Sequence, residues 1–552
     1  MSTSGPLVAQ SDHTLMLEVQ HPKYEECRDF LVSFAELMKS PDFIHTYRVT
    51  PLSMWNAAAV RVTVTEIVDG LSKYARYTVP ANVITNIEEW HGIFGKLILS
   101  SYSEKLLRLE VKDSRILERI RKDEDLEPFW QEDSENSLFI DVGQRGNVKQ
   151  ALIKAGYPVD DTCGYVPGAP LEIELRKEDL DNNVFGLRDY QIDAVQAFYQ
   201  SGRETGGSGV IVLPCGSGKT IIGLGVMASV SSRTLIVATN NVSVNQWRDE
   251  LIKKTNASSD QIGEFTGVIK EVKPITITTY QMLIYRRDRN EPMKNLELFT
   301  LRDWGLIIYD EVHLLPAPVF RATTEIQARR RLGLTATLIR EDGREDDVFA
   351  LIGPKRYDVP WKVLEGRGFI AEAYCTEYRL PLPQEEEIRY AYADKRKRFR
   401  VAAENPQKLE LVEQLILNHP DDCILVIGQY ISQVEKIAQS LNLPLITGKT
   451  KHPEREELYA AFRARRIKVM VVSKVANFAV DLPDASVLIQ VSGAFGSRQE
   501  EAQRLGRILR PKNRRSLFYT LVSKGTDEQA FAAKRQLFLV EQGYKYYIRY
   551  YP

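Results

Sequence analysis

A short glycine-rich stretch in the middle of the chain has residue types and spacing that suit phosphate binding. Its sequence is LPCGSGKT, and apolar runs at 210–212 and 221–227 flank it, which predicts a strand, a loop and a helix. Such a loop directs backbone N–H groups at phosphates where the helix begins, and the helix dipole favours negative charge there. We therefore expect a phosphate loop made of Leu213, Pro214, Cys215, Gly216, Ser217, Gly218, Lys219 and Thr220.

The polar and flexible positions of this phosphate loop have separate expected tasks. Gly216 and Gly218 let the backbone approach the phosphates, Lys219 can reach the β- and γ-phosphates, and the Thr220 hydroxyl can hold Mg²⁺. The strict pattern has a glycine six residues before the lysine, where this chain has Leu213. The alternative is a glycine-rich turn beside a lysine that caps an ordinary helix.

Two adjacent acidic residues follow an apolar run at 306–309. A buried parallel strand that ends in two acids places both carboxylates at the C-terminal edge of the sheet, next to the phosphate loop. We expect Asp310 to hold Mg²⁺ directly or through its water, and Glu311 to orient and deprotonate the attacking water. The alternative is a surface Asp-Glu pair that caps the next helix.

The segment FGLRDYQ at 185–191 precedes the phosphate loop and opens an amphipathic helix. The amide of Gln191 both donates and accepts hydrogen bonds, so it could recognise adenine. A glutamine at a helix start does not by itself indicate adenine binding. The assignment depends on the position of Gln191 ahead of the phosphate loop. Arg188 is assigned to the nucleotide with it.

Short polar side chains end three other predicted strands, at 234–238, 274–278 and 332–337. Hydroxyl and amide groups at strand ends suit contacts to a sugar–phosphate backbone, which position a strand without reading its sequence. The candidates for nucleic-acid contact are Asn240, Thr278 and Thr279. The candidates for coupling nucleotide to nucleic acid are His313, Thr335 and Thr337.

Residues 366–552 repeat an α/β rhythm but contain no second phosphate loop. The segment QRLGRILR near their end would place Gln503, Arg507 and Arg510 on one helical face. Arginines presented in this way can meet a γ-phosphate held by the other lobe and stabilise charge in the transition state. The alternative is a solvated basic helix, which fits Arg504 better because it points elsewhere.

Length and composition limit the classes of protein to consider. A chain of 552 residues is too long for one core and suggests about three domains. With 73 Lys and Arg against 74 Asp and Glu, any nucleic-acid contact must come from local patches. We expect no membrane span and no signal peptide. The scattered cysteines argue against a disulfide framework, a zinc site or an iron–sulfur cluster and fit a reducing cytoplasm.

The first 150 residues differ from the rest. Paired strands near residues 7–17 and a helical face from Tyr24 to Met38 come first. Three predicted helices and a hairpin, at 52–59, 63–74, 80–94, 96–100 and 106–111, indicate a winged-helix-like unit. Because Glu88 and Glu89 lie on its third helix, protein contact or structural support is favoured over direct DNA recognition.

The order of the blocks YQ, LPCGSGKT, DEVH, TAT and QRLGRILR resembles a superfamily 2 helicase motor. The XPB family of DNA repair helicases is the closer resemblance. Arg340-Glu341-Asp342 after TAT resembles the RED element of that family, and 471–493 with 496–512 resemble its last two motor blocks. The segment NPQK at 405–408, after a short charged insert at 385–400, resembles a small form of the family's thumb. The N-terminal region resembles that of bacterial and archaeal members.

The resemblance implies a fold and an activity. The fold would be α/β, with two tandem RecA-like lobes, each a parallel sheet flanked by helices, preceded by the α+β N-terminal domain with its winged-helix-like unit. Expected bounds are 1–180, 181–365 and 366–552, with a thumb-like insert at about 384–404. The activity would be DNA-dependent ATP hydrolysis between the lobes, with 3′–5′ movement and strand separation. The resemblance to repair helicases implies a role in DNA repair.

The resemblance also carries over site residues and ligands. ATP and Mg²⁺ are the implied cofactors, and Asp481 would touch nucleotide although Val480 replaces the glycine that many related motors have before it. The basic patch KRKRFR could grip DNA, with Phe399 stacking on a base, or it could be only a solvated face. The further DNA candidates are Arg340, Glu341, Asp342, Lys395, Arg396, Arg398, Phe399, Ser473 and Lys474.

The expected partner is DNA at junctions of single and double strands, in the cytoplasm of a prokaryote and associated with the nucleoid. A nuclease or other repair protein is a further expected partner, through the N-terminal domain or the thumb. Three activities compete: a 3′–5′ helicase, a double-strand translocase that does not unwind, and an ATP-gated DNA scaffold that recruits such a partner. RNA is a weaker alternative substrate.

Overall fold

The computed structural model describes most of the chain in two compact units. The described residues are 5–39, 43–103, 105–134, 136–161, 168–202, 206–214, 216–286, 295, 298–299, 302–315, 326, 328–337, 345–359, 361–473, 485–493, 497–509 and 515–552. By contacts, residues 1–212 group with 218–358, and residues 213–217 group with 359–552. The predicted boundary between the lobes near residue 365 stays a prediction.

The first unit begins with a four-stranded antiparallel sheet of order β1-β2-β4-β3, whose strands are Leu7–Ala9, Thr14–Glu18, Ile44–Arg48 and Glu36–Lys39. Helix α1 (Tyr24–Val32) ends before β3. The predicted helical face is therefore wrong at its C-terminal end, because Leu37 and Met38 lie in a strand. Leu37 is buried and Met38 is exposed, which is the alternation that a strand requires.

Three short helices follow, as the sequence predicted: α2 (Pro51–Ala59), α3 (Val64–Tyr74) and α4 (Ala81–Ile93). Thr50 and Thr63 cap the first two by accepting hydrogen bonds from the amides of Ser53 and Glu66. The expected hairpin is β5 (Leu97–Ser101) with β6 (Leu106–Val111). A five-stranded sheet extends it, in the order β7-β8-β6-β5-β9, with β7, β8 and β9 at Trp130–Ser134, Ser137–Asp141 and Val159–Asp161. Helices α5 (Ser114–Arg121) and α6 (Arg145–Lys154) complete this α+β region.

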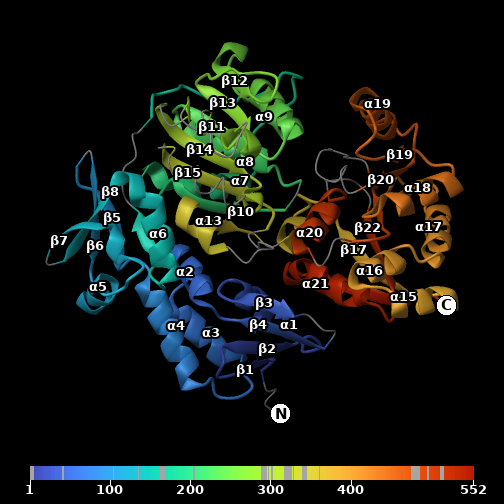
Figure 1. Cartoon of the computed structure of the whole chain (residues 1–552), viewed down its shortest axis with the longest axis horizontal. Coiled ribbons are helices and arrows are strands. Elements are labelled where there is room, and N and C mark those ends of the chain that lie inside the picture. The colour runs from blue at the N-terminus through green and yellow to red at the C-terminus, as the bar shows by residue number, and fades with distance from the viewer. Residues whose placement is uncertain are drawn as a thin grey trace. The chain divides into compact units, whose positions relative to one another are not determined.

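The first lobe is a parallel seven-stranded sheet of order β12-β13-β11-β14-β15-β10-β16. Its strands are Ile262–Phe265, Ile275–Thr279, Thr234–Ala238, Trp304–Asp310, Ala328–Thr335, Ser208–Val212 and Lys355–Asp358. The described helices that follow these strands or precede the first are α7 (Asp189–Tyr199), α8 (Lys219–Val230), α9 (Asn241–Lys254), α10 (Tyr280–Leu283) and α13 (Glu345–Ile352). Figure 1 shows α7, α8 and α9 alongside this sheet. The sheet confirms the predicted RecA-like architecture of this lobe.

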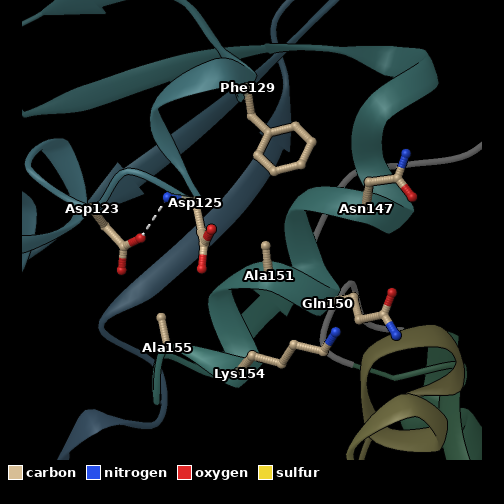
Figure 2. A pocket seen from close by; sticks show the side chains of 8 residues that line it. All are labelled: Asp123, Asp125, Phe129, Asn147, Gln150, Ala151, Lys154 and Ala155. Carbon is tan, nitrogen blue, oxygen red and sulfur yellow. Dashed lines mark hydrogen bonds between the residues drawn. The ribbon is translucent and has the colours of Figure 1, made fainter.

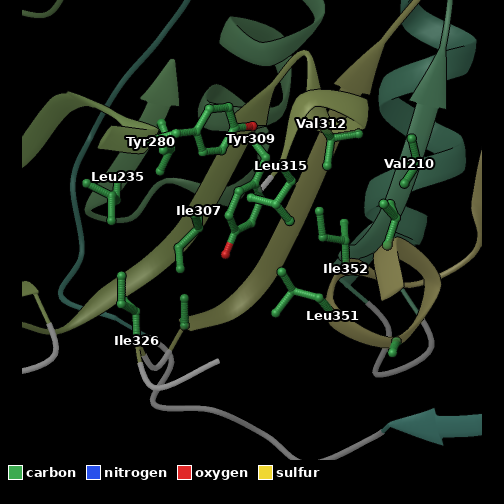
Figure 3. Close-up of a cluster of buried hydrophobic side chains, with 14 of the residues drawn as sticks. Val210, Leu235, Tyr280, Ile307, Tyr309, Val312, Leu315, Ile326, Leu351 and Ile352 are labelled. Carbon is green, nitrogen blue, oxygen red and sulfur yellow. The ribbon is translucent and has the colours of Figure 1, made fainter. Parts of the chain in front are cut away.

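The core of the first lobe explains why its strands are continuously apolar. Strands β10, β11 and β14 are buried along most of their length, as parallel strands covered on both faces are. Figure 3 shows Ile307, Tyr309 and Val312 packing together with Leu351 and Ile352 of α13. This packing fixes the C-terminal edge of the sheet, where the polar residues lie.

Helix α13 joins the N-terminal region to the first lobe. Trp55 of α2 and Phe94 pack on Phe349, with ring centroids 6.2 and 6.4 Å away. The Gln150 amide of α6 donates a hydrogen bond of 2.6 Å to Asp347 Oδ1. The N-terminal region therefore shares a hydrophobic core with the lobe.

The second unit contains another parallel seven-stranded sheet, of order β19-β20-β18-β21-β22-β17-β23. Its strands are Leu445–Ile446, Val469–Ser473, Ile424–Gly428, Val487–Gln490, Ser516–Ser523, Ala373–Leu380 and Tyr546–Tyr550. Its described helices are α14 (Trp361–Gly366), α15 (Gln384–Tyr392), α16 (Lys395–Ala403), α17 (Gln407–Asn418), α18 (Ile431–Ser440), α19 (His452–Arg463), α20 (Arg498–Gly506) and α21 (Asp527–Glu541). The second sheet completes the predicted pair of RecA-like lobes.

Several expected absences can be compared with the described part of the chain. Cys27, Cys375 and Cys423 are buried free thiols. Among the described residues, no group of three or more His, Cys, Asp or Glu side chains is arranged to bind a metal. Within the same residues, no helix combines the length and the apolar character that crossing a bilayer requires.

Candidate functional site

The phosphate loop has the backbone that its glycines predict. Gly216 and Gly218 have φ of 81° and 79°, in the left-handed region that side chains disfavour. Gly218 is also the N-cap of α8, and a Cβ there would lie 2.7 Å from the Gln191 amide nitrogen. The Ser217 hydroxyl donates to the Pro214 carbonyl at 2.7 Å, which closes the turn. Cys215 lies outside the described residues.

Lys219 connects this loop to the acidic pair. It is the first residue of α8, where the first amides have no acceptor within the helix. Its Nζ lies 3.6 Å from Glu311 Oε1, and both side chains are largely buried. A γ-phosphate bound by Lys219 would therefore lie close to the carboxylate that we expect to act on water.

Asp310 is the last residue of β14, and Glu311 follows it with a φ of 49°. Burial raises the pKa of Asp310 to about 6, and the neighbouring Glu311 carboxylate adds to this rise. Glu311 precedes a short 3₁₀ turn, Val312–Leu314, and its side chain makes no capping bond there among the described residues. The sheet edge therefore holds two carboxylates that are not explained by helix capping.

Mg²⁺ and a nucleotide fit the residues that lie at this edge. Magnesium prefers oxygen ligands, and the Asp310 carboxylate and the Thr220 hydroxyl supply them. A divalent cation would also offset the like charges of Asp310 and Glu311, which destabilise each other when both are ionised. Thr220 is the second residue of α8, directly after Lys219, whereas Asp310 ends β14.

The three coupling candidates lie in one buried hydrogen-bonded group. The Thr335 hydroxyl donates to the Thr337 carbonyl at 2.6 Å. His313 Nδ1 is within hydrogen-bond distance of the Thr335 hydroxyl oxygen. Because the Thr335 hydroxyl gives its only proton to the Thr337 carbonyl, the hydrogen bond with His313 requires a protonated Nδ1 that donates to the Thr335 oxygen. His313 Nδ1 is also 3.4 Å from Glu311 Oε2, so the group reaches the acidic pair.

Gln191 and Arg188 lie at the start of α7, beside the phosphate loop. Gln191 is buried, and its Oε1 accepts from the Arg188 amide at 2.9 Å. Its Nε2 donates to the Tyr190 hydroxyl at 3.4 Å and faces Gly218. The oxygen and the nitrogen of the Gln191 side-chain amide thus both have protein partners. Its predicted contact with adenine stays a prediction.

The described DNA candidates of the first lobe lie at or just after the ends of β11 and β13. Asn240 caps α9 and Thr279 caps α10, so both lie where a helix begins at the sheet edge. Thr278 is fully buried, and its hydroxyl donates to the Phe265 carbonyl at 2.8 Å, so its contact with DNA stays a prediction. Both faces of β13 are covered at this end, because Thr279 is buried as well. Arg340, Glu341 and Asp342 lie outside the described residues.

In the second unit, α20 ends at Gly506, with Arg507 as its C-cap. Helix α20 therefore contains Gln503 and is capped by Arg507, whereas Arg510 lies outside the described residues and its place on the same face stays a prediction. Arg504 was assigned to a solvated face, but it is buried and donates to Gln490 Oε1 and to the Ser492 carbonyl at 2.5 and 3.2 Å. Ser473 ends β20 and is buried, whereas Asp481 and Lys474 lie outside the described residues.

The thumb-like insert consists of α15 and α16. The Phe399 ring is half-buried and packs on Phe531 with centroids 4.7 Å apart, and its stacking on a base stays a prediction. Arg398 donates to the carbonyls of Ala391 and Ala393, at 3.0 Å each, which closes the turn after α15. Lys395 is exposed. The side chain of Arg396 lies outside the described residues.

One described pocket lies apart from these residues, in the N-terminal region. Figure 2 shows Phe129, Asp123 and Asp125 opposite Asn147, Gln150 and Lys154 of α6. The Asp125 amide donates to Asp123 Oδ1 at 3.0 Å. Two carboxylates at its rim disfavour phosphate, so this pocket is not a second nucleotide site.

Two functional residues were missed by the sequence analysis. The Trp247 indole N–H donates to Asp310 Oδ2 at 3.1 Å, and the Tyr280 hydroxyl donates to the Asp310 carbonyl at 2.8 Å. Trp247 had no local signal, since its partner lies 63 residues away along the chain. Tyr280 directly follows β13 in the sequence, but nothing local predicts a hydrogen bond to Asp310, which lies 30 residues away along the chain.

Comparisons with known proteins identify the family of this chain. Residues 364–549 match the model of the ERCC3/RAD25/XPB C-terminal helicase, 7–135 that of the helicase conserved C-terminal domain, and 185–340 that of the type III restriction enzyme, res subunit. The DNA 3′-5′ helicase XPB of Kineococcus radiotolerans is 49% identical over 549 residues, which cover 99% of this chain and 96% of that protein. This chain belongs to the XPB family.

Other XPB relatives are similar over comparable lengths. The DNA 3′-5′ helicase XPB of Mycobacterium tuberculosis is 47% identical and covers 99% of this chain and 98% of its own. An Enterocytozoon bieneusi protein named general transcription and DNA repair factor IIH helicase/translocase subunit XPB is 34% identical, over 99% and 92% of the two chains.

Among solved structures, the Hef helicase domain of Pyrococcus furiosus has a TM-score of 0.43 and 16% identity, over 62% of this chain and 97% of that one.

Proposed function

We propose that this member of the XPB family is an ATP-dependent 3′–5′ DNA helicase that acts in DNA repair. The observation that carries the proposal is the contact between Lys219 and Glu311, 3.6 Å apart, which joins the phosphate loop to the acidic sheet edge. The bacterial relatives named DNA 3′-5′ helicase XPB support the choice of DNA and of direction.

In this proposal the first lobe binds the nucleotide phosphates. Lys219 and the first amides of α8 bind the β- and γ-phosphates, while Thr220 and Asp310 hold Mg²⁺. Bound Mg²⁺ neutralises charge that develops on the phosphates during transfer. Glu311 orients the attacking water and takes its proton. Arg188 and Gln191 are assigned to the adenine side of the same nucleotide.

The second lobe supplies positive charge to the same reaction. Arg507 and Arg510 are assigned to the γ-phosphate, where they stabilise the transition state, and Gln503 and Asp481 to the nucleotide. Hydrolysis would remove the group that both lobes bind. Repeated binding and hydrolysis would then move the lobes along one DNA strand.

Contacts with the DNA backbone are assigned to Asn240 and Thr279 at helix starts and to the exposed cations of the thumb. The RED-like residues 340–342, with Ser473 and Lys474, are proposed to lie near the strand or the junction. The group of His313, Thr335 and Thr337 is assigned to coupling, because it reaches Glu311. A nuclease or another repair protein is the proposed protein partner.

A translocase that moves on duplex DNA without unwinding is the second candidate. The Enterocytozoon bieneusi relative, named helicase/translocase subunit, favours it. The two candidates share the ATP site and differ only in strand separation.

The test measures ATP hydrolysis by the purified chain with and without DNA, together with unwinding of a forked duplex that has a 3′ tail. DNA-stimulated hydrolysis with unwinding is the expected result. Stimulation of hydrolysis without unwinding would favour the translocase. An equal rate of ATP hydrolysis with and without DNA would contradict the proposal. Lys219→Ala is the control, and it should abolish hydrolysis while the fold is kept.

A further inference from the structure

Asp310 receives two hydrogen bonds that the proposed cycle does not use. Trp247 is 1% exposed, and its indole N–H donates to Asp310 Oδ2 at 3.1 Å. Tyr280 is 4% exposed, and its hydroxyl donates to the Asp310 carbonyl at 2.8 Å. One donor therefore orients the carboxylate of Asp310, and the other fixes the main chain of the same residue.

The two donors belong to helices that begin at candidate DNA contacts. Trp247 lies on α9, whose N-cap Asn240 accepts from the amides of Val242 and Ser243 at 2.9 and 3.0 Å. Tyr280 opens α10, whose N-cap is Thr279. The strand register pairs Ala238 with Thr279 and Val237 with Tyr309, so both helix starts lie at the same edge of the sheet as the end of β14.

The position of the indole is fixed by a glycine of the phosphate-loop helix. A Cβ on Gly223 of α8 would lie 2.4 Å from Trp247 Cη2. Only glycine leaves room for the ring between α8 and α9. The donor to Asp310 is thus held by the helix that starts at the phosphate loop and by the helix that starts at Asn240.

We propose that Trp247 and Tyr280 are positioning residues that hold Asp310 in its Mg²⁺-binding orientation and through which DNA at α9 and α10 acts on hydrolysis. Hydrogen-bond donors behind a ligand carboxylate fix its orientation and tune its affinity for the metal. Because the indole N–H already binds Oδ2, Oδ1 would be the more available oxygen for Mg²⁺ or its water. The part of this inference that concerns DNA rests on the proposed function.

The test titrates the full-length chain with ADP by calorimetry, once with Mg²⁺ and once with EDTA. Trp247→Phe keeps a ring and removes the N–H, and Tyr280→Phe removes only the hydroxyl. Both variants should bind ADP about tenfold more weakly with Mg²⁺, and both should match the unchanged chain in EDTA. DNA stimulation of hydrolysis should also fall in both.

A matched control lies at the other end of the same strand. Trp304 is 1% exposed, and its indole N–H donates to the Phe299 carbonyl at 2.9 Å, far along β14 from Asp310. Trp304→Phe removes an equivalent bond and should leave the difference between Mg²⁺ and EDTA unchanged. Gly223→Ala is a second route, since it displaces the indole of Trp247 and should give the same Mg²⁺-specific loss.

The outcomes separate this inference from the proposed function. Unchanged affinity with Mg²⁺ in Trp247→Phe and Tyr280→Phe would overturn the positioning role. Equal losses in Mg²⁺ and in EDTA would also overturn it, because they indicate a merely structural role. If DNA does not change the rate of ATP hydrolysis by the unchanged chain, the proposed function fails, and so does the proposed effect of DNA through α9 and α10. The calorimetry contains no DNA, so it still tests whether Trp247 and Tyr280 position Asp310 for Mg²⁺.

Discussion

Glu311 lies between two groups of side chains that have different tasks. One carboxylate oxygen is 3.6 Å from Lys219, and the other is 3.4 Å from His313 of the coupling group. Lys219, Asp310 and Glu311 could be predicted from the sequence, because phosphate loops and strand-terminal acids are local patterns. Trp247 could not, since only folding brings it to Asp310. The burial of Thr278 and the ring contact of Phe399 were not predicted, because residue type does not reveal which way a side chain points.

Replacing Glu311 by glutamine should separate binding from hydrolysis. Glu311→Gln keeps the size of the side chain but cannot accept the proton of the attacking water. We expect the rate of ATP hydrolysis to fall by about 100- to 10,000-fold, with little change in ADP affinity. Hydrolysis assays and calorimetry measure the two effects. Glu271→Gln, at an exposed glutamate of the same lobe, is the control, and an active Glu311→Gln would remove Glu311 from the water-activating role.

His45 makes the N-terminal region sensitive to acid. It is buried beside the Tyr24 hydroxyl, and burial, with the nearby Arg28 charge, lowers its pKa from 6.5 to about 4. Between these values the unfolded chain binds more protons, so stability should fall as pH drops from 6.5 to 4, by up to about 3 kcal/mol. His45→Gln cannot titrate and should lose this part of the pH dependence. Unfolding midpoints at pH 7 and pH 5 measure it, and the same slope in both proteins would contradict it.

At the scale of elements, long apolar strands flanked by turns were predictable, and irregular segments were not. Strand β14 was predicted because four apolar residues precede Asp310, whereas β12, β17 and β23 were missed because polar residues interrupt their apolar pattern. Leu37 and Met38 fit a helical spacing by chance, and pairing of Leu37 with Tyr47 decides for a strand. Tertiary pairing overrides local spacing here.

The contact of α2 with α13 gives a prediction at the same scale. Trp55 is buried against Phe349 in the core that the N-terminal region shares with the first lobe. Trp55→Ala should lower the free energy of unfolding by about 3–5 kcal/mol and should speed hydrogen exchange at the α13 amides. Phe43→Ala, at a residue that is 65% exposed, is the matched control. Unchanged exchange at α13 in Trp55→Ala would show that the two regions fold independently.

At the scale of the whole molecule, a net charge of −1 leaves DNA attraction to local groups of cations. Lys395, Lys397 and Arg400 are exposed on the thumb. Lys397 pairs with the exposed Asp394, and Arg400 pairs with the half-buried Glu404. Exposed pairs of this kind are weak and exchange readily for phosphate. The thumb is therefore the described surface from which we expect counterion release when DNA binds.

Removing these three charges should change the salt dependence of DNA binding. Each contact between a cation and a phosphate of single-stranded DNA contributes about 0.7 to the slope of log affinity against log salt. The triple variant Lys395→Ala, Lys397→Ala and Arg400→Ala should therefore reduce that slope by about 2. A matched variant, Arg463→Ala, Arg466→Ala and Lys468→Ala, removes the same charge from exposed positions at the end of α19. If both triple variants reduce the slope equally, the effect comes from net charge; if only the thumb variant does, the thumb binds the DNA backbone.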